Sequence, residues 1–266
     1  MLALVTSDIH GYMRIFERYS ELLRNGPYAI GIIVGDILDD GFKPGDFEEA
    51  IAGTDLHPDD FLPELAGADE DLSEYAVRQL RSLHSVDSPF MRAMSNIEGK
   101  VKAVLNRSGK PVYVVPGNHD QTRWTTDRGV INVDGRREEY GPINLVGYRW
   151  TTLDRRDRDQ RRDLRKLGRF VDENTILVTH SPPYGTLDDV QNEETGTVHF
   201  GSKPVKRLVA RRSPAIVLCG HVHRRFGRLQ NVINCAFPAS RQFVAVDLTR
   251  GTSEPVDSGI PAGFWK

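Results

Sequence analysis

Short apolar runs recur along the chain, and each of them stops at a turn of polar residues or glycine. They span Leu2–Thr6, Ala29–Val34, Pro111–Val115, Thr175–Thr179 and Ala215–Cys219. Runs of this length that are rich in β-branched residues and bounded by turn residues predict buried β-strands.

A helical pattern lies between the first two of these runs, within Met13–Leu23. Its apolar face carries Ile15, Tyr19, Leu22 and Leu23. A strand, a helix and a second strand in this order indicate an α/β layered fold. Segments 143–153 and 229–248 have strand-like patterns with no helical periodicity, so we expect hairpins there and sheets of mixed direction.

The stretch after the second strand interrupts this rhythm. Residues 39–74 hold thirteen Asp or Glu and one Lys, and helical patterns follow at Leu72–Leu83 and Met91–Leu105. We therefore predict a single domain over residues 1–266 with an acidic, helical insertion at 41–96. The acidic run is interpreted as a solvated face or loop, and a lid that excludes the wrong anionic substrates is the alternative.

Composition narrows the class of protein. Charged residues make up 27% of the chain, yet the formal net charge is −2, which excludes a globally basic nucleic-acid binder. No apolar run reaches the 18 or so residues that a membrane span needs, and no signal peptide is recognised, so we expect a cytoplasmic protein. Cys219 and Cys235 lie in apolar runs and are predicted to be buried thiols. The mixed-charge run at 154–169 has an excess of Arg; we interpret it as an exposed loop or helix, and a phosphate-binding patch is the alternative.

Five of the eight histidines directly follow strand-like runs, together with Asp, Asn or Gly. They are His10, His119, His180, His221 and His223, and the neighbouring carboxylates are Asp8, Asp36 and Asp39. Ligands of open α/β sheets bind at the carboxyl ends of strands, where residues far apart in sequence converge. The other histidines, His57, His84 and His199, have unremarkable neighbours.

This set of side chains favours metal binding. Imidazole and carboxylate suit Mn, Fe, Co, Ni or Zn, and no cysteine is among them. The set exceeds the three ligands that a catalytic zinc usually takes, and it fits two metals about 3.5–4 Å apart with Asp36 as the bridge. A lone histidine at a strand end is more often simply packed, but five in this pattern are hard to obtain by chance.

Read in order, these blocks resemble the calcineurin-like metallophosphoesterases. The blocks are DIH at 8–10, GDILD at 35–39, GNHD at 117–120, TH at 179–180 and GHVH at 220–223. The resemblance implies a four-layer αββα sandwich of two mixed β-sheets flanked by helices. It implies one metal held by Asp8, His10, Asp36 and His223, and a second held by Asp36, Asn118, His180 and His221. His119 would lie over the substrate phosphate.

Departures from the family pattern disfavour three branches of the family. Asp40 stands where protein Ser/Thr phosphatases carry an arginine, and Asp120 stands where they carry a glutamate. Asp39 occupies the position of the tyrosine of the purple acid type. Only 43 residues follow His223, too few for the capping domain of the double-strand-break nucleases, so we expect no dedicated DNA-binding domain. The stretch after His180, HSPPYGTLDD, is similar to small prokaryotic members.

The resemblance implies hydrolysis of a phosphodiester by a hydroxide that bridges two divalent metals, with Mn or Fe foremost and Zn, Ni or Co as alternatives. Asn118 and the metals would bind phosphoryl oxygens, and His119 would act as general acid or, alternatively, would orient a ligand. Asp39 and Asp120 are expected to fix histidine tautomers, with Asp120 paired to His119.

Several alternatives stay open at this point. Trp124 and Tyr184 lie near the motif blocks and either touch a leaving group or, as we favour, only pack. The same centre would also suit a phosphomonoesterase or nucleotidase. A non-catalytic scaffold is disfavoured because each ligand position is filled. The expected substrate is a small phosphate ester or nucleotide, and a homodimer is compatible with the sequence.

Overall fold

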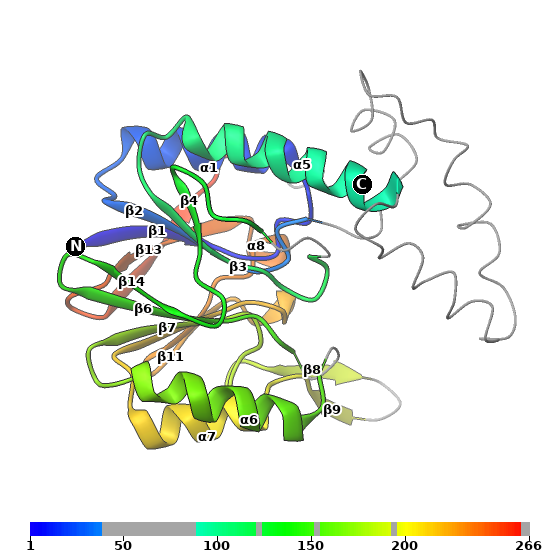
Figure 1. Ribbon diagram of the computed structural model, residues 1–266, viewed down its shortest axis with the longest axis vertical. Coiled ribbons are helices and arrows are strands. Elements are labelled where there is room, and N and C mark those ends of the chain that lie inside the picture. The colour runs from blue at the N-terminus through cyan, green and yellow to red at the C-terminus, as the bar shows by residue number, and fades with distance from the viewer. Residues whose placement is uncertain (39–88, 121–123, 152–154, 193–195, 262–266) are drawn as a thin grey trace, which may run out of the picture.

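The computed structural model describes residues 1–38, 89–120, 124–151, 155–192 and 196–261, and within them two six-stranded sheets lie face to face (Figure 1). The first sheet has the order β14 (Thr252–Asp257), β13 (Gln242–Asp247), β1 (Leu2–Thr6), β2 (Ile30–Val34), β3 (Val112–Val115) and β4 (Val130–Asn132). The second has the order β11 (Gly227–Leu229), β12 (Val232–Asn234), β10 (Ile216–Cys219), β7 (Thr175–Thr179), β6 (Ile143–Tyr148) and β5 (Arg137–Tyr140).

Helices cover the outer face of each sheet. α1 (Met13–Asn25) and α5 (Pro89–Asn106) lie on the first sheet, and α6 (Asp157–Leu167) and α7 (Lys203–Arg212) lie on the second (Figure 1). A short hairpin of β8 (Asp189–Asn192) and β9 (Gly196–His199) forms a separate sheet. The remaining elements are the short helix α8 (Phe237–Ser240) and two 3-10 turns, η2 (Gly168–Phe170) and η3 (His223–Arg225).

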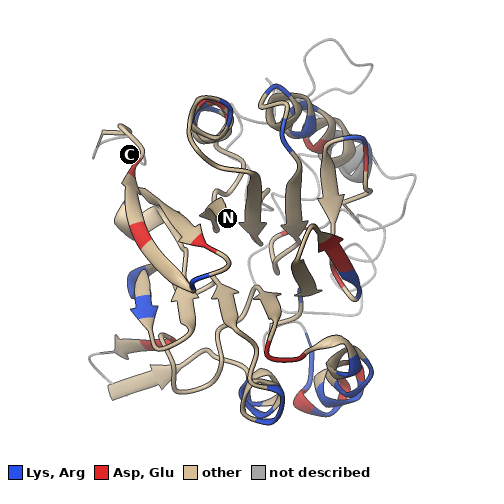
Figure 2. Ribbon diagram, turned by 90° about the vertical axis from the view of Figure 1, so that its left-hand side faces the viewer, with Lys and Arg blue, Asp and Glu red and all other residues tan. Residues whose placement is uncertain are grey.

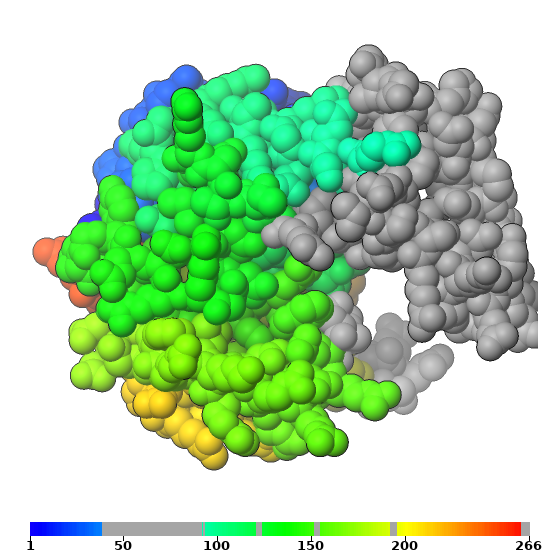
Figure 3. Space-filling view, in the orientation of Figure 1, coloured from blue at the N-terminus to red at the C-terminus, as the bar shows by residue number. Residues whose placement is uncertain are grey.

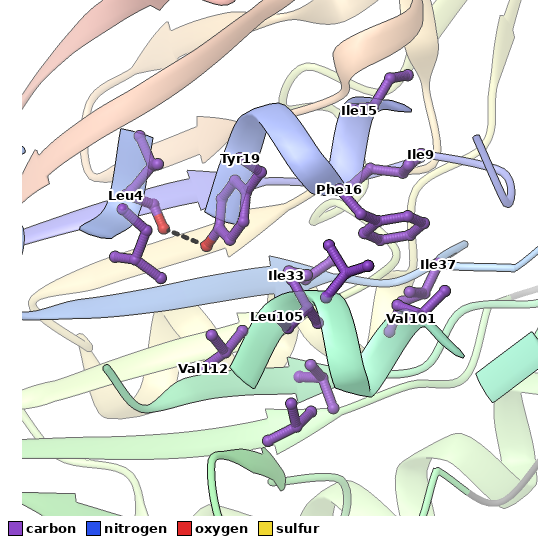
Figure 4. Packing of buried hydrophobic residues seen from close by; sticks show 14 of the residues in the cluster. Leu4, Ile9, Ile15, Phe16, Tyr19, Ile33, Ile37, Val101, Leu105 and Val112 are labelled. Carbon is purple, nitrogen blue, oxygen red and sulfur yellow. Dashed lines mark hydrogen bonds between the residues drawn. The ribbon is translucent and has the colours of Figure 1, made fainter. Parts of the chain in front are cut away.

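Three hydrophobic clusters correspond to the three boundaries between the four layers. The first joins α1 and α5 to the first sheet, and there the buried hydroxyl of Tyr19 donates to the carbonyl of Leu4 at 2.7 Å (Figure 4). The second lies between the two sheets, where Val5 and Ile32 meet Val178 and Leu218. The third packs α6 and α7 on the second sheet. Side chains close the space between the sheets on the face shown in Figure 3.

The central strands of both sheets run parallel, so their carboxyl ends share one edge of the molecule. β1, β2 and β3 are parallel neighbours in the first sheet, as are β6, β7 and β10 in the second. Antiparallel strands flank both sets, through β13 in the first sheet and β5 in the second. The predicted αββα architecture with mixed sheets is therefore confirmed.

The prediction of a hairpin over 229–248 is wrong, because the two strands in this segment do not pair with each other. β12 and β13 belong to different sheets, and α8 links them. Two hairpins, β11–β12 and β13–β14, are found instead, within residues 227–257. The pattern could not reveal the change of sheet, because alternation along a strand reports which side is buried but not which neighbour it pairs with.

Other predicted elements are confirmed or lie outside the described residues. The pattern at Met91–Leu105 is α5, and the charged run at 154–169 contains α6. Cys219 and Cys235 are buried free thiols. The helical pattern at Leu72–Leu83 and residues 41–88 of the predicted insertion lie outside the described residues, whereas its last residues, 89–96, belong to α5. None of the described helices is both long enough and apolar enough to cross a bilayer.

Candidate metal centre

Five strand ends from the two sheets bring the predicted ligands together. β1 leads into Asp8 and His10, β2 into Asp36, β3 into Asn118, β7 into His180, and β10 into His221 and His223. Because both sets of parallel strands end at the same edge, residues up to 213 positions apart in the chain touch there. The convergence that was expected from the sequence is thus present.

The turns after these strands have unusual backbone geometry. Four of the residues have φ in the left-handed region, with values of 60° at Asp8, 51° at His10, 45° at Asp36 and 67° at His221. Non-glycine residues rarely adopt this conformation, and it costs about 1–3 kcal/mol for each residue. Hydrogen bonds between neighbouring turns hold it, since the His10 amide donates to the carbonyl of Asp36 at 3.0 Å. The strain is concentrated where the side chains converge.

Two glycines of the motif blocks are required by close approach. A Cβ at Gly117 would lie 2.1 Å from Oδ1 of Asp36 and 2.8 Å from Nε2 of His180. A Cβ at Gly220 would collide with the hydroxyl oxygen of Ser7 and with Oδ2 of Asp8. Any side chain at either position would therefore displace the ligand-type atoms.

We call Asp8, His10 and His223 the outer group, because its two imidazoles are only half-buried. The Nε2 atoms of His10 and His223 are 3.2 Å apart, and Nε2 of His223 lies 3.3 Å from Oδ1 of Asp8. Both oxygens of the buried Asp8 carboxylate also accept from the backbone N–H of His221, at 3.0 and 3.1 Å. The three side chains thus point into one small volume.

We call Asp36, His180 and His221 the inner group, because Asp36 and His180 are buried. Nε2 of His180 lies 3.2 Å from Oδ2 of Asp36 and 3.1 Å from Oδ1 of Asn118. Its Nδ1 lies 2.9 Å from the carbonyl of Val34, which fixes the ring. Nε2 of His221 is buried and has no hydrogen-bond partner.

The charges of the two groups are coupled. Burial opposes the ionised form of Asp36, but His180 and His10 outweigh it and hold the pKa of Asp36 well below its usual range. Burial also opposes the charged form of His180, yet Asp36 and Asp8 raise the pKa of His180 to about 10. Burial and the neighbouring His180 lower the pKa of His221 to about 4. Asp36 therefore interacts with a histidine of each group.

These features fit two divalent cations. The donors are imidazole nitrogens and carboxylate or amide oxygens, the set that suits Mn, Fe, Co, Ni or Zn. An unpartnered buried nitrogen at His221 normally costs free energy, and a cation would remove that cost. Two facing Nε2 atoms at 3.2 Å likewise satisfy each other only if one is protonated, whereas a cation accepts both lone pairs.

Asp120 has different partners from those predicted. Its buried carboxylate accepts from the backbone N–H groups of Gly117 at 2.7 Å, Leu38 at 2.7 Å and Ile37 at 3.1 Å, instead of pairing with His119. Burial, with a further contribution from Asp36, raises the pKa of Asp120 to about 6. Asp120 thus ties the GNHD turn to the GD turn. Asp39 lies outside the described residues.

His119 lies at the edge of the outer group. Its backbone N–H donates to Oδ1 of Asp36 at 3.0 Å, and its ring stands edge-on to His10 with 5.1 Å between the centroids. The His119 side chain is half-buried. Trp124 is fully buried in the first cluster, in agreement with the packing interpretation.

Sequence reasoning missed two side-chain contacts, one on the GNHD turn and one on the β8–β9 hairpin. The guanidinium of Arg149 donates to the carbonyls of Asp120 at 2.7 Å and Gly117 at 3.4 Å, and so clamps the GNHD turn from the second sheet. His199 is held by the buried Asp188 at 2.9 Å and lies against Tyr184, with 5.0 Å between ring centroids. Neither contact has a sequence signal, because the partners are up to 32 positions apart and follow no repeat.

Comparisons with known proteins agree with this geometry. Solved structures include TT1561 of Thermus thermophilus, which matches with a TM-score of 0.57 at 14% identity over 97% of this chain and 98% of that one. UPF0046 protein K07C11.7 of Caenorhabditis elegans is 36% identical over 59 residues, 22% of this chain and 19% of that protein. Protein MJ1162 of Methanocaldococcus jannaschii is 28% identical over 122 residues, 42% of this chain and 56% of that protein.

The matched stretches thus cover only part of both curated relatives, and the structural match shows the fold alone. The family comparison reaches further along the chain. The model of the calcineurin-like phosphoesterases matches residues 1–225, a range that contains every block from Asp8 to His223. The chain therefore belongs to the calcineurin-like phosphoesterase family.

Proposed function

We propose that the protein hydrolyses a phosphodiester at a centre of two divalent cations. One ion is held by Asp8, His10, Asp36 and His223, and the other by Asp36, Asn118, His180 and His221. The observation that carries this proposal is the position of Asp36, whose carboxylate lies 3.2 Å from His180 and is electrostatically coupled to His10. A carboxylate between two sets of imidazoles is the arrangement that a shared ligand requires.

The donor set favours Mn or Fe, with Zn, Ni or Co as alternatives. When bound, two such ions make hydroxide available near neutral pH and neutralise charge on the phosphoryl group. The protein's own part is to fix the ligands beforehand. The strained turns at Asp8 and Asp36, and the carbonyl of Val34 against His180, hold these side chains in place without substrate.

Asn118 and His119 are the residues that we assign to substrate. The amide oxygen of Asn118 faces His180. The NH₂ group of Asn118 is therefore the part that would donate to a phosphoryl oxygen. The imidazole of His119 stands beside His10 on the half-buried rim and is the proposed general acid for the leaving oxygen. Its main chain is fixed through the hydrogen bond to Asp36, so the ring is held close to the centre.

Substitution His119→Ala tests this assignment with two diesters that differ in the leaving group. We expect a loss of about 10²–10⁴-fold on a diester with an alkyl leaving group, the usual contribution of a positioned acid, and a much smaller loss on a nitrophenyl diester. Metal content should not change. His199→Ala, a half-exposed histidine on the hairpin, is the matched control. Equal losses on both diesters would contradict the acid role and point to phosphate binding.

The same centre would suit a phosphomonoesterase or nucleotidase. Initial rates on matched nitrophenyl mono- and diesters, measured with added Mn, distinguish the two reactions. We expect the diester to have the higher kcat/KM. A higher value for the monoester would replace the diesterase proposal and leave the metal assignment in place. No turnover of either ester by the fully metal-loaded protein would instead favour a non-catalytic scaffold.

A further inference from the structure

A groove runs between α6 and α7 on the outer face of the second sheet, away from the strand ends that carry the metal centre. It encloses about 450 Å³. Leu164, Pro204 and Leu208 form its apolar floor, and Gly168 closes one part of it. A Cβ at Gly168 would lie 2.9 Å from Leu208, so the glycine allows the two helices to approach.

Arginines line the groove on both sides. They are Arg161, Arg165, Arg207, Arg211 and Arg212, and all five are exposed. In Figure 2 the ribbons of both helices of this layer are blue over many residues, which marks Lys and Arg. The whole chain has a formal net charge of −2, so this concentration of positive charge is local.

The groove arginines differ from other arginines of the same layer. Arg162 pairs with Asp159 and Asp163, and Arg155 pairs with Asp163 at 2.9 Å. Among the described residues, no ion pair joins any groove arginine to a carboxylate. Asp159 and Asp163 of α6 are therefore paired with arginines outside the groove. The positive charge of the groove is left for an external anion.

The chemistry of this site fits phosphate. A guanidinium presents a planar fork of N–H donors that matches phosphate oxygens, and five guanidinium groups around one groove favour an anion with several phosphates. A volume of about 450 Å³ lies within the range of small-molecule pockets, and the apolar floor suits an organic group. We propose that the groove binds a small phosphate-bearing polyanion of the nucleoside polyphosphate class, at a site separate from the metal centre.

Calorimetric titration of the full metal-loaded chain with ATP, and in parallel with inorganic tripolyphosphate, tests the proposal. The groove variant Arg165→Gln/Arg211→Gln should bind about 100-fold more weakly, about tenfold for each lost charge-assisted contact. The matched control is Arg162→Gln, an exposed arginine of the same helix that is paired to carboxylates. It should keep wild-type affinity, and circular dichroism should show the same fold for all variants.

A second background separates the groove from the metal centre. Asp36→Asn disturbs the centre but leaves the groove intact, so this variant should still bind ATP, and the two groove substitutions should still weaken that binding. Three results would overturn the proposal. The first is an unchanged affinity for ATP in the groove variant, and the second is an equal loss of affinity in Arg162→Gln. The third is a single-stranded oligonucleotide that binds more tightly than ATP, with an affinity that increases with its length. The last would show a nucleic-acid surface instead of a small-molecule site.

Discussion

The inner and outer groups of the centre use the same kinds of side chain but differ in environment. In the inner group His180 is completely buried, and its two ring nitrogens are engaged by Val34 and by Asp36 and Asn118. In the outer group the His223 side chain is 40% exposed, and its Nε2 faces another histidine. The fold fixes one group tightly and leaves the other open to solvent.

This difference has consequences for the two ions. A buried ligand set whose orientation is fixed by further hydrogen bonds binds more tightly than an exposed one. We therefore expect the inner ion to be retained during purification and the outer ion to exchange with solvent. Asp36 links both groups, so a substitution of Asp36 should weaken the binding of both ions alike.

The largest effect is expected for Asp36→Asn. The amide cannot supply a negative charge to either ion, so both occupancies should fall and activity should drop by about 10³-fold, the upper range for removing one key electrostatic contact. Elemental analysis and initial rates measure both quantities. Asp257→Asn, an exposed carboxylate on β14, is the control. Full occupancy of both sites in Asp36→Asn would show that Asp36 is not shared.

A smaller and selective effect is expected for His180→Asn. This change removes the partner of the buried Asp36 carboxylate, so the metal-free fold should lose about 3–5 kcal/mol of unfolding free energy. The inner ion should be lost while the outer ion is still taken up. Urea unfolding of the metal-free protein and metal analysis check the two expectations. If His180→Asn lost only the outer ion, the assignment of His180 to the inner ion would be wrong.

The exposed counterpart, His223→Asn, should be milder. Water can replace a half-exposed imidazole, so we expect about a 10–100-fold weaker affinity for the outer ion and little change in the stability of the metal-free fold. Titration with Mn followed by calorimetry measures this affinity. If His223→Asn destabilised the fold as much as His180→Asn, the contrast between the two groups would be wrong.

The dependence on pH gives a graded effect, which is the smallest when it is taken for a single pH unit. Without metal, the pKa of His180 is raised from 6.5 to about 10, so its charged form stabilises the fold fully below pH 6.5, and this contribution is lost as the pH rises through 10. Metal binding must displace that proton, so affinity for the inner ion should rise about tenfold per pH unit from pH 7 to 9. In His180→Asn, which no longer holds the inner ion, the dependence of stability on pH should flatten. A wild-type affinity that is flat over this range would contradict the coupling.

The parts of this account that could be predicted are those encoded by local patterns. Short apolar runs that end in Asp, Asn, His and Gly placed the ligands at strand ends, and the order of the blocks led to the αββα fold. Parallel strands then bring such residues to one edge without further information. The convergence of Asp8 and Asp36 follows from this rule, whereas His180 joins them from the second sheet, as the family resemblance implied.

The parts that could not be predicted depend on which elements become neighbours. The chain passes from the second sheet to the first between β12 and β13, and the alternation of apolar and polar side chains does not reveal this change. Asp120 was paired with His119 because they are adjacent, yet its carboxylate turns toward the N–H groups of Ile37 and Leu38. Arg149 and His199 carried no motif, and their contacts exist only once the two sheets are packed.

The most direct test of the central claim is the number of ions bound by the wild-type chain. Metal-free protein is loaded with Mn or Fe, freed of excess metal and analysed for metal per chain, before and after dialysis against a weak chelator. The account predicts two ions per chain after loading and one after dialysis, with the remaining ion absent in His180→Asn. A content that never exceeds one ion per chain would contradict the two-ion centre.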